Sequence, residues 1–200
     1  MSAPKTLLAL AGAPSAPPPL RDSAVVVIDA QREYVDGALP LPGVEAALDQ
    51  ISALLARARK AGAPIIHVRH LGRAGGLFDP DAPRGAIADK AKPAAGEPVI
   101  GKKLPNAFAG TDLAAALAKT GKRNLVVCGF MTHMCISSTV RAALDLGFRS
   151  IVPASATATR DLPDPLTGAV VPARTLQSAS LAALSDRFAT VVGDAANIPE

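Results

Sequence analysis

One cysteine of this 200-residue sequence is placed where it could act as a nucleophile. Of the two cysteines, Cys128 falls inside the apolar run Leu125–Cys128, where it would pack like other small apolar residues. Cys135 follows a short loop after this run and begins a helical pattern. The positive end of a helix favours a thiolate over a thiol, so we expect a reactive sulfur at Cys135.

A carboxyl group at the end of another predicted strand could take the proton of this thiol. Asp29 directly follows the β-branched run Ala24–Ile28. The backbone amides of Met131 and Cys135 could hold the oxyanion that forms when sulfur attacks a carbonyl. Each residue also has an ordinary structural interpretation, because cysteines fill cores and an aspartate after a strand often caps the next helix. The residues alone leave both interpretations open.

Alternating strands and helices must position these groups. Continuous apolar runs predict strands buried on both faces, and apolar residues at three- and four-residue steps predict helices. The expected strands cover residues 24–28, 65–68, 98–100, 125–128, 151–152 and 190–192, and the expected helices cover 44–61, 111–121 with Thr111 as its cap, 136–147 and 173–184. This order predicts an α/β fold with a doubly wound, mainly parallel sheet and helices on both faces, a Rossmann-like three-layer sandwich.

Both candidate groups fall where such folds bind ligands, beyond the carboxyl ends of the strands at the point where the strand order reverses. The Gly- and Pro-rich segment 71–98 is typical of a long loop, and long loops in compact domains are usually functional. No break in composition divides the chain. We therefore expect an N-terminal arm over residues 1–23 and one domain over residues 24–200.

The composition argues against several classes of partner. Lys and Arg number 21 against 17 Asp and Glu, and the basic residues are scattered, which does not favour a nucleic-acid surface. The apolar run Leu7–Ala13 is too short to cross a membrane. Two cysteines make no disulfide framework, which indicates a reducing, cytoplasmic setting. The expected partner is a small-molecule substrate, with no nucleic acid and no membrane.

Three segments taken together resemble the isochorismatase-like cysteine hydrolases. They are Val27–Gln31, then Gly96–Lys102 followed by Asn106–Leu113, then Cys128–Cys135. The resemblance runs from about Ala24 to the end of the chain, so residues 24–200 would form the isochorismatase-like hydrolase domain. Members of this family share an Asp, Lys, Cys triad, which the resemblance carries over to Asp29, Lys102 and Cys135.

The resemblance selects one lysine of an adjacent pair and implies an unusual peptide bond. Lys102, rather than Lys103, stands six residues before Phe108, as the family spacing requires. Its ammonium would favour both a carboxylate and a thiolate beside it. Family members typically carry a non-proline cis peptide just before the nucleophile, which would fall at Phe130–Met131.

The resemblance implies neither a cofactor nor a metal. Some relatives hold a metal through an Asp-x-His cluster shortly after the first strand, and this chain lacks that pattern. Its three histidines are His67, expected in the core, His70, which could line the pocket or bond a loop, and His133, which could serve as a relay or lie on the surface. Gln177 stands where the family often has a histidine. The family is commonly oligomeric, so a homo-oligomer is expected.

These observations predict a cofactor-independent hydrolase of a small amide, carbamoyl or related C–N substrate, acting through a cysteine thioester. One alternative is isochorismatase-type vinyl-ether hydrolysis, which Cys135 disfavours because those enzymes usually lack the cysteine. Another is a catalytically silent homologue that serves in binding or assembly. A thiol redox sensor is a weaker hypothesis, because Cys128 is poorly placed to resolve an oxidised Cys135.

Overall fold

A parallel sheet forms the centre of the molecule. The computed structural model describes residues 3–200, and the sheet runs in the order β3-β2-β1-β4-β5-β9, with β6 also paired to β4. All of these pairings are parallel. The strands are β1 (Ser23–Ile28), β2 (Ile65–His70), β3 (Val99–Lys102), β4 (Asn124–Phe130), β5 (Arg149–Pro153), β6 (Thr157–Ala158) and β9 (Ala189–Val192). The predicted α/β fold is confirmed.

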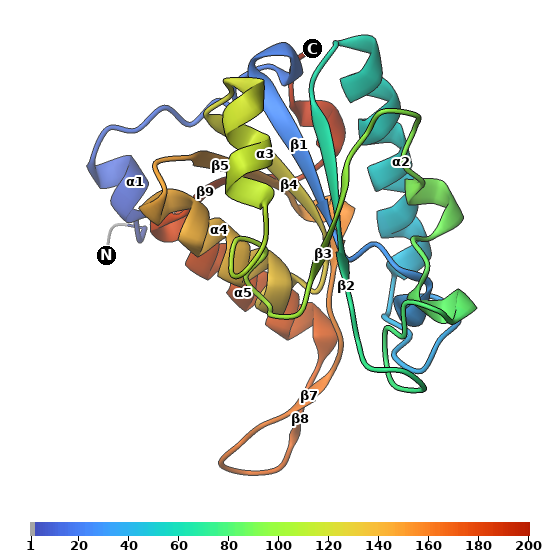
Figure 1. Ribbon diagram of the computed structural model, residues 1–200. Coiled ribbons are helices and arrows are strands. Elements are labelled where there is room, and N and C mark those ends of the chain that lie inside the picture. Colours follow the sequence, from blue (N-terminus) through green and yellow to red (C-terminus); the bar gives the residue numbers. More distant parts are fainter. Residues whose placement is uncertain (1–2) are drawn as a thin grey trace.

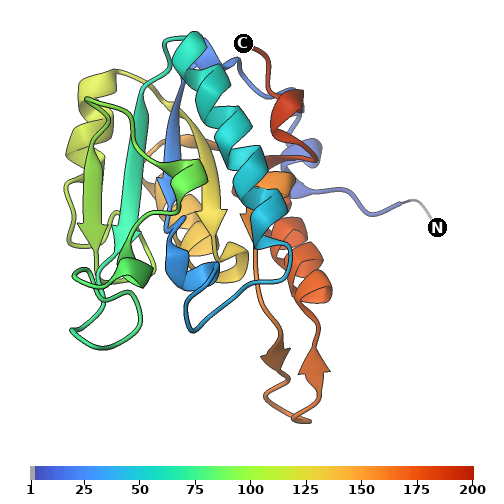
Figure 2. The same ribbon diagram turned by 90° about the vertical axis from the view of Figure 1, so that its right-hand side faces the viewer.

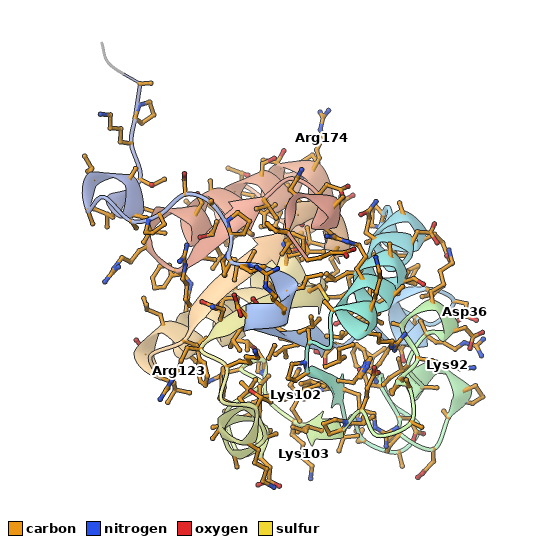
Figure 3. All side chains as sticks on the ribbon, turned by 90° about the horizontal axis from the view of Figure 1, so that it is seen from above. Asp36, Lys92, Lys102, Lys103, Arg123 and Arg174 are labelled. Atoms are coloured by element: carbon orange, nitrogen blue, oxygen red, sulfur yellow. The ribbon has the colours of Figure 1, made fainter. Side chains whose placement is uncertain are left out.

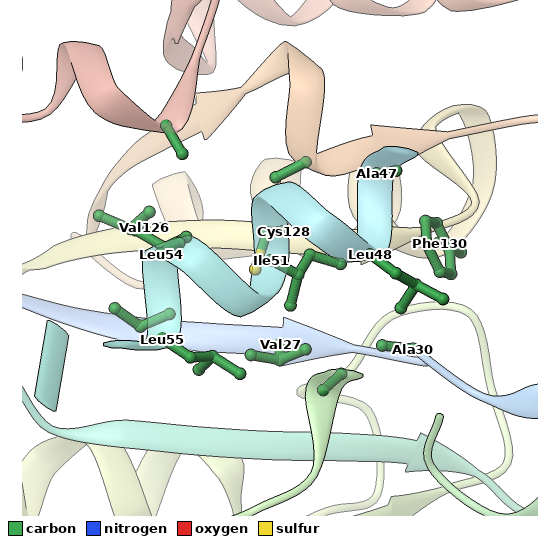
Figure 4. Packing of buried hydrophobic residues seen from close by; sticks show 14 of the residues in the cluster. Val27, Ala30, Ala47, Leu48, Ile51, Leu54, Leu55, Val126, Cys128 and Phe130 are labelled. Atoms are coloured by element: carbon green, nitrogen blue, oxygen red, sulfur yellow. The ribbon is translucent and has the colours of Figure 1, made fainter. Parts of the chain in front are cut away.

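Helices cover both faces of the sheet and complete three layers (Figure 1). On one face lies α2 (Val44–Lys60), and on the other lie α3 (Leu113–Thr120), α4 (Ser137–Asp145) and α5 (Ala173–Arg187). Figure 4 shows Leu48, Ile51 and Leu55 of α2 packed over Val27 and Val126 of the sheet. All five side chains are buried, and each contributes roughly 1.5–3 kcal/mol by leaving water.

The strand order reverses between β1 and β4, and a glycine marks this boundary. The chain proceeds from β1 to β2 and β3 on one side, and from β4 to β5 and β9 on the other. Gly129 of β4 pairs with Ile28 of β1, and its φ is +112°. A Cβ at Gly129 would lie 1.9 Å from the backbone oxygen of Ile28, so only glycine fits there. The carboxyl ends of β1 and β4 can therefore lie side by side.

Three short strands are absent from the sequence-based prediction. They are β6 and the two strands of an antiparallel hairpin, β7 (Leu162–Pro163) and β8 (Val170–Val171), which projects from the body of the molecule (Figures 1 and 2). Strands of two residues are too short to show an alternating pattern. The predicted loop 71–98 is confirmed, and it contains two single-turn 3₁₀ helices, Pro83–Gly85 and Asp89–Ala91.

The predicted cap of one helix is wrong by a residue. The helix α3 begins at Leu113 with Asp112, not Thr111, in the cap position. The Thr111 hydroxyl still accepts a hydrogen bond from the Leu113 amide at 3.2 Å, and it donates to the carbonyl of Ala107. Thr111 therefore bonds the turn that precedes α3, and the helix begins one residue later than the pattern indicates.

The predicted N-terminal arm packs partly against the domain, and its residues 1–2 lie outside the described part of the chain. A single helical turn, α1 (Leu7–Leu10), is held to α5 by a 2.8 Å hydrogen bond from the Leu7 amide to Asp186 Oδ1. Leu20 is buried, and Ser23, the last residue of the predicted arm, begins β1. Within residues 3–200, no helix has the length and apolar character needed to cross a membrane.

Candidate active site

The structure brings Asp29, Lys102 and Cys135 together at the carboxyl end of the sheet. Lys102 Nζ lies 2.6 Å from Asp29 Oδ2 and 3.4 Å from Cys135 Sγ. Asp29 and Lys102 are fully buried, whereas Cys135 keeps 5% of its surface exposed. Lys103 is exposed and points outward (Figure 3), so the lysine in the cluster is the one that the family spacing selects. Three residues far apart in the chain therefore meet in one contact network.

Local backbone geometry directs Asp29 into this cluster. The residue follows β1 with φ +50°, in the left-handed region that non-glycine residues rarely adopt. Its amide donates to the carbonyl of Val68 at 2.8 Å, and its carbonyl accepts from the amide of Gln31 at 2.8 Å. The pairing with β2 thus continues one residue past the strand, while the chain turns. A residue held in this region is a reason to suspect function.

Cys135 is presented by a single π-helical turn between β4 and α4. The turn covers Thr132–Ile136, and such turns occur frequently at functional sites. The Thr132 hydroxyl donates to the carbonyl of Ala158 at 3.1 Å, which ties the turn to β6. The peptide bond Phe130–Met131 is cis, as the family resemblance implies.

Burial controls the charge state of the cluster. Burial raises the pKa of Asp29 above its usual range, and the ammonium of Lys102 opposes this rise. Burial also raises the pKa of the Cys135 thiol to about 12, with the Asp29 carboxylate acting in the same direction. The expectation that the helix end favours a thiolate is therefore wrong for the resting site, because desolvation outweighs it. The resting sulfur carries its proton.

His70 extends the cluster on the side of β2. Its Nδ1 lies 3.2 Å from Lys102 Nζ, and its ring meets Phe78 edge-on at 5.2 Å between centroids. Burial, and then the charge of Lys102, lowers the pKa of His70, so the ring is neutral and Nδ1 can accept a hydrogen bond from the ammonium. The structure places the His70 ring in contact with the cluster through Lys102.

Two buried polar residues that the sequence analysis missed fasten the 71–98 loop beside the cluster. Gln31 Nε2 donates to the carbonyl of Gly85 at 2.8 Å, and Gln31 Oε1 accepts from the amide of His70 at 2.8 Å. Glu33 Oε2 accepts from the amide of Phe78 at 2.9 Å. Both side chains are completely buried. Gln31 and Glu33 follow Asp29 at two-residue steps, which is the signal that the sequence offered. The burial of the Glu33 carboxyl group cannot be recognised from the sequence.

Aromatic side chains form an apolar wall next to these groups. Tyr34 meets Phe78 at 5.0 Å and Phe130 at 5.8 Å, both edge to face. Burial, followed by the charges of Asp29 and Cys135, raises the pKa of Tyr34. Such a wall lowers the local polarity and strengthens the electrostatic contacts within the cluster.

The remaining predicted positions lie outside this network. His67 is buried and contacts Glu97 Oε2 through Nε2 at 2.9 Å, as expected of a core histidine, although its Nδ1 has no partner. His133 contacts the hydroxyl of Thr159. Gln177 Nε2 donates to the Thr157 hydroxyl at 2.8 Å, a contact within the chain. Across residues 3–200, no group of three or more His, Cys, Asp or Glu side chains is placed to hold a metal ion.

A doubly wound parallel sheet with buried acid, ammonium and thiol groups at its switch point places the chain among the α/β enzymes. The family model for the isochorismatase domain matches residues 23–196, and the chain belongs to this family of hydrolases.

Individual relatives agree with this assignment. The chain is similar to a crystal structure of an isochorismatase from Pseudomonas putida KT2440, with a TM-score of 0.92 and 43% identity over 98% of this chain and 100% of the other. It is 39% identical to the secreted isochorismatase effector Isc1 of Verticillium dahliae, over 90% of this chain and 93% of the relative. It is 33% identical to maleamate amidohydrolase of Pseudomonas putida, over 66% of this chain and 70% of the relative.

Proposed function

We propose that the protein hydrolyses a small amide, carbamoyl or related C–N substrate without a cofactor, through a thioester on Cys135. The observation that carries this proposal is the position of Lys102 Nζ, 2.6 Å from Asp29 Oδ2 and 3.4 Å from Cys135 Sγ. A thiol next to a carboxylate base is the arrangement that activates a cysteine nucleophile. Maleamate amidohydrolase, a relative whose name states amide hydrolysis, supports the choice of bond.

The first half of the proposed reaction forms the thioester. Because the resting thiol holds its proton, the proton moves from Cys135 Sγ to the Asp29 carboxylate as sulfur attacks the carbonyl carbon. The backbone amides of Met131 and Cys135 hold the resulting oxyanion. Collapse of this intermediate breaks the C–N bond, and the proton on Asp29 passes to the leaving nitrogen. Ammonia or an amine departs, and the acyl group remains on sulfur.

The second half releases the acid. Asp29, again a carboxylate, takes a proton from water as the water oxygen bonds to the thioester carbon. Collapse then breaks the C–S bond, and the proton returns from Asp29 to the sulfur. In both halves the Lys102 side chain stabilises whichever of its two neighbours carries negative charge. Burial of all three groups strengthens this stabilisation because water does not screen it.

A panel of small amides, carbamoyl compounds and vinyl ethers tests the proposal. We expect ammonia release from at least one amide or carbamoyl compound, and its loss in Cys135→Ala. The control Cys128→Ala removes the other thiol, which lies in β4 away from Lys102, and should retain activity. Pyruvate release from vinyl ethers alone, or full activity in Cys135→Ala, would contradict the proposal.

A homo-oligomeric state and a cytoplasmic location remain predictions, and one relative is a secreted protein.

A further inference from the structure

The ammonium group of Lys102 has three N–H bonds and meets three acceptors. A lysine side chain donates hydrogen bonds and accepts none. Its nitrogen lies 2.6 Å from Asp29 Oδ2, 3.2 Å from His70 Nδ1 and 3.4 Å from Cys135 Sγ. Among residues 3–200, no fourth group lies within hydrogen-bond distance of this nitrogen. Because the side chain has no exposed surface, each of the three neighbours takes one N–H bond.

His70 is the one acceptor of the three to which the proposed reaction assigns no task. Asp29 serves there as the base and Cys135 as the nucleophile. Since the ammonium only donates, His70 Nδ1 accepts, which places the ring proton on Nε2 and leaves the ring neutral. Burial of the ring and the charge of Lys102, which lower the pKa of His70, favour the same state.

The fold holds the His70 ring in place by contacts other than the one to Lys102. His70 and Lys102 are paired residues of β2 and β3, so their side chains leave the sheet on the same face. The buried side chain of Gln31 accepts from the His70 amide at 2.8 Å and donates to its carbonyl at 3.1 Å. The ring of Phe78 meets the imidazole edge-on at 5.2 Å. The acceptor is therefore already in position when the ammonium turns towards it.

We propose that His70 is a positioning residue of the reaction, which fixes the rotation of the Lys102 ammonium so that its other two N–H bonds point at Asp29 and Cys135. This inference rests on the proposed amide hydrolysis and assigns a task to a residue that the reaction leaves unused. Rotation about the Cε–Nζ bond moves all three N–H bonds together, so one fixed bond directs the other two.

Loss of the third acceptor would weaken the bond to the sulfur. An unpaired N–H of an ammonium without exposed surface is costly, so the group would rotate or shift to share its remaining acceptors. The charge that develops on Cys135 Sγ during the reaction would then meet a poorly aligned donor. The loss should fall on kcat more than on KM, because this charge is absent from the ground state.

Two substitutions of similar shape separate the acceptor from the packing of the ring. In His70→Asn the amide oxygen can take the place of Nδ1, whereas His70→Leu has the same branching and no acceptor. Both lose the ring contact with Phe78. On the best amide of the panel, we expect His70→Leu to lower kcat by about tenfold or more and His70→Asn to stay within about threefold of the wild type. KM should stay within about threefold in both.

The other histidine of β2 that is buried provides the matched control. His67 contacts Glu97 Oε2 at 2.9 Å, outside the reacting cluster. His67→Asn and His67→Leu should differ in kcat by less than about threefold, since neither changes an acceptor of Lys102. Equal losses of kcat in the two His70 variants, or the same contrast at His67, would overturn the inference.

Alkylation by iodoacetamide reports on the sulfur without requiring turnover. The thiolate is the form that reacts, and the aligned N–H of Lys102 stabilises it. Peptide mass spectrometry at one fixed pH should therefore give a rate at Cys135 that is about tenfold or more lower in His70→Leu than in the wild type, with His70→Asn within about threefold of the wild type. Equal rates in all three proteins would also overturn the inference.

The two measurements together separate this inference from the proposed function. If an amide is hydrolysed and the two His70 variants lose activity equally, the positioning role is contradicted while amide hydrolysis stands. If no amide is hydrolysed and the alkylation of Cys135 still depends on the acceptor at His70, the proposed function alone is contradicted.

Discussion

Two clusters of similar side chains lie along β2, and they differ in how their charges are satisfied. The Glu97 cluster consists of His67, Glu97 and Arg59, and the Asp29 cluster consists of Asp29, Lys102, His70 and Cys135. Glu97 accepts hydrogen bonds from both nitrogens of the Arg59 fork at 2.8 and 2.9 Å, from His67 at 2.9 Å and from the Ala94 amide at 2.8 Å.

The two carboxylates respond in opposite directions. The hydrogen bonds of Arg59, which outweigh burial, lower the pKa of Glu97 to about 2. Burial, which outweighs the Lys102 ammonium, raises the pKa of Asp29. A carboxylate with many donors is fixed as an anion and serves the structure, whereas one that is deeply buried with few donors can accept a proton. The balance of burial and hydrogen-bond donors around the carboxylate, not the residue types, separates a reactive cluster from a structural one.

The largest expected difference between the clusters is in activity. Asp29→Asn removes the proposed base and should lower kcat by about 10²–10⁴-fold on the best amide of the panel. Glu97→Gln, the matched substitution in the other cluster, should leave kcat within about threefold. Steady-state ammonia release measures both. Similar losses of kcat in the two variants would contradict the distinction between the Asp29 cluster and the Glu97 cluster.

The clusters should also differ in how stability depends on their cation. Lys102→Met leaves the buried Asp29 without a counter-ion and should lower the free energy of unfolding by about 3–5 kcal/mol near neutral pH. The folded-state pKa of Asp29 then lies still further above its unfolded value, so the loss shrinks as pH falls and Asp29 becomes protonated. Urea unfolding at several pH values measures this. A double variant with Asp29→Asn should recover part of the loss, and simple additivity would contradict the coupling.

A smaller effect on the free energy of unfolding is expected from Glu97, at acid pH. The pKa of Glu97 falls from 4.5 to about 2 on folding, so its contribution is present above pH 4.5 and is lost as pH falls towards 2. Since the Arg59 side chain is 38% exposed, solvent screening limits this contribution to about 1 kcal/mol. Glu97→Gln should flatten the unfolding free energy over that interval. An unchanged acid slope would show that Glu97 is not responsible.

The smallest effect is expected one residue away from Lys102. Lys103 is exposed and forms no ion pair within the described residues 3–200. Lys103→Met should therefore change the free energy of unfolding by less than about 0.5 kcal/mol and kcat by less than about twofold. Parallel assays of Lys102→Met and Lys103→Met measure the contrast. A large loss in Lys103→Met would overturn the choice between the adjacent lysines.

The sequence was sufficient to predict six of the seven strands of the central sheet and two of the residues that meet at its carboxyl end. Continuous apolar runs identify β1 and β4 because both strands are buried on both faces. Asp29 and Cys135 follow these strands, so the general rule for ligand sites in α/β sheets already brings them near each other. Lys102 came from the family resemblance, since nothing in the pattern around it separates it from Lys103.

Other features depend on tertiary contacts that leave no local signal. The two-residue strand β6 exists because it pairs with β4, and this pairing places the Ala158 carbonyl where it accepts the hydrogen bond of Thr132 in the π-helical turn. The buried carboxylate of Glu33 looks like an ordinary surface charge in the sequence. The charge state of Cys135 was predicted in the wrong direction, because the degree of burial that controls its pKa is a property of the folded chain.

The most direct test of the account is the mass of the enzyme during turnover. Protein quenched in acid while it hydrolyses the best amide of the panel should gain the mass of the acyl group, located on the peptide that contains Cys135. The same treatment of Cys135→Ala should yield no adduct and no ammonia. An adduct on another residue, or undiminished hydrolysis by Cys135→Ala, would contradict a thioester formed in the Asp29 cluster.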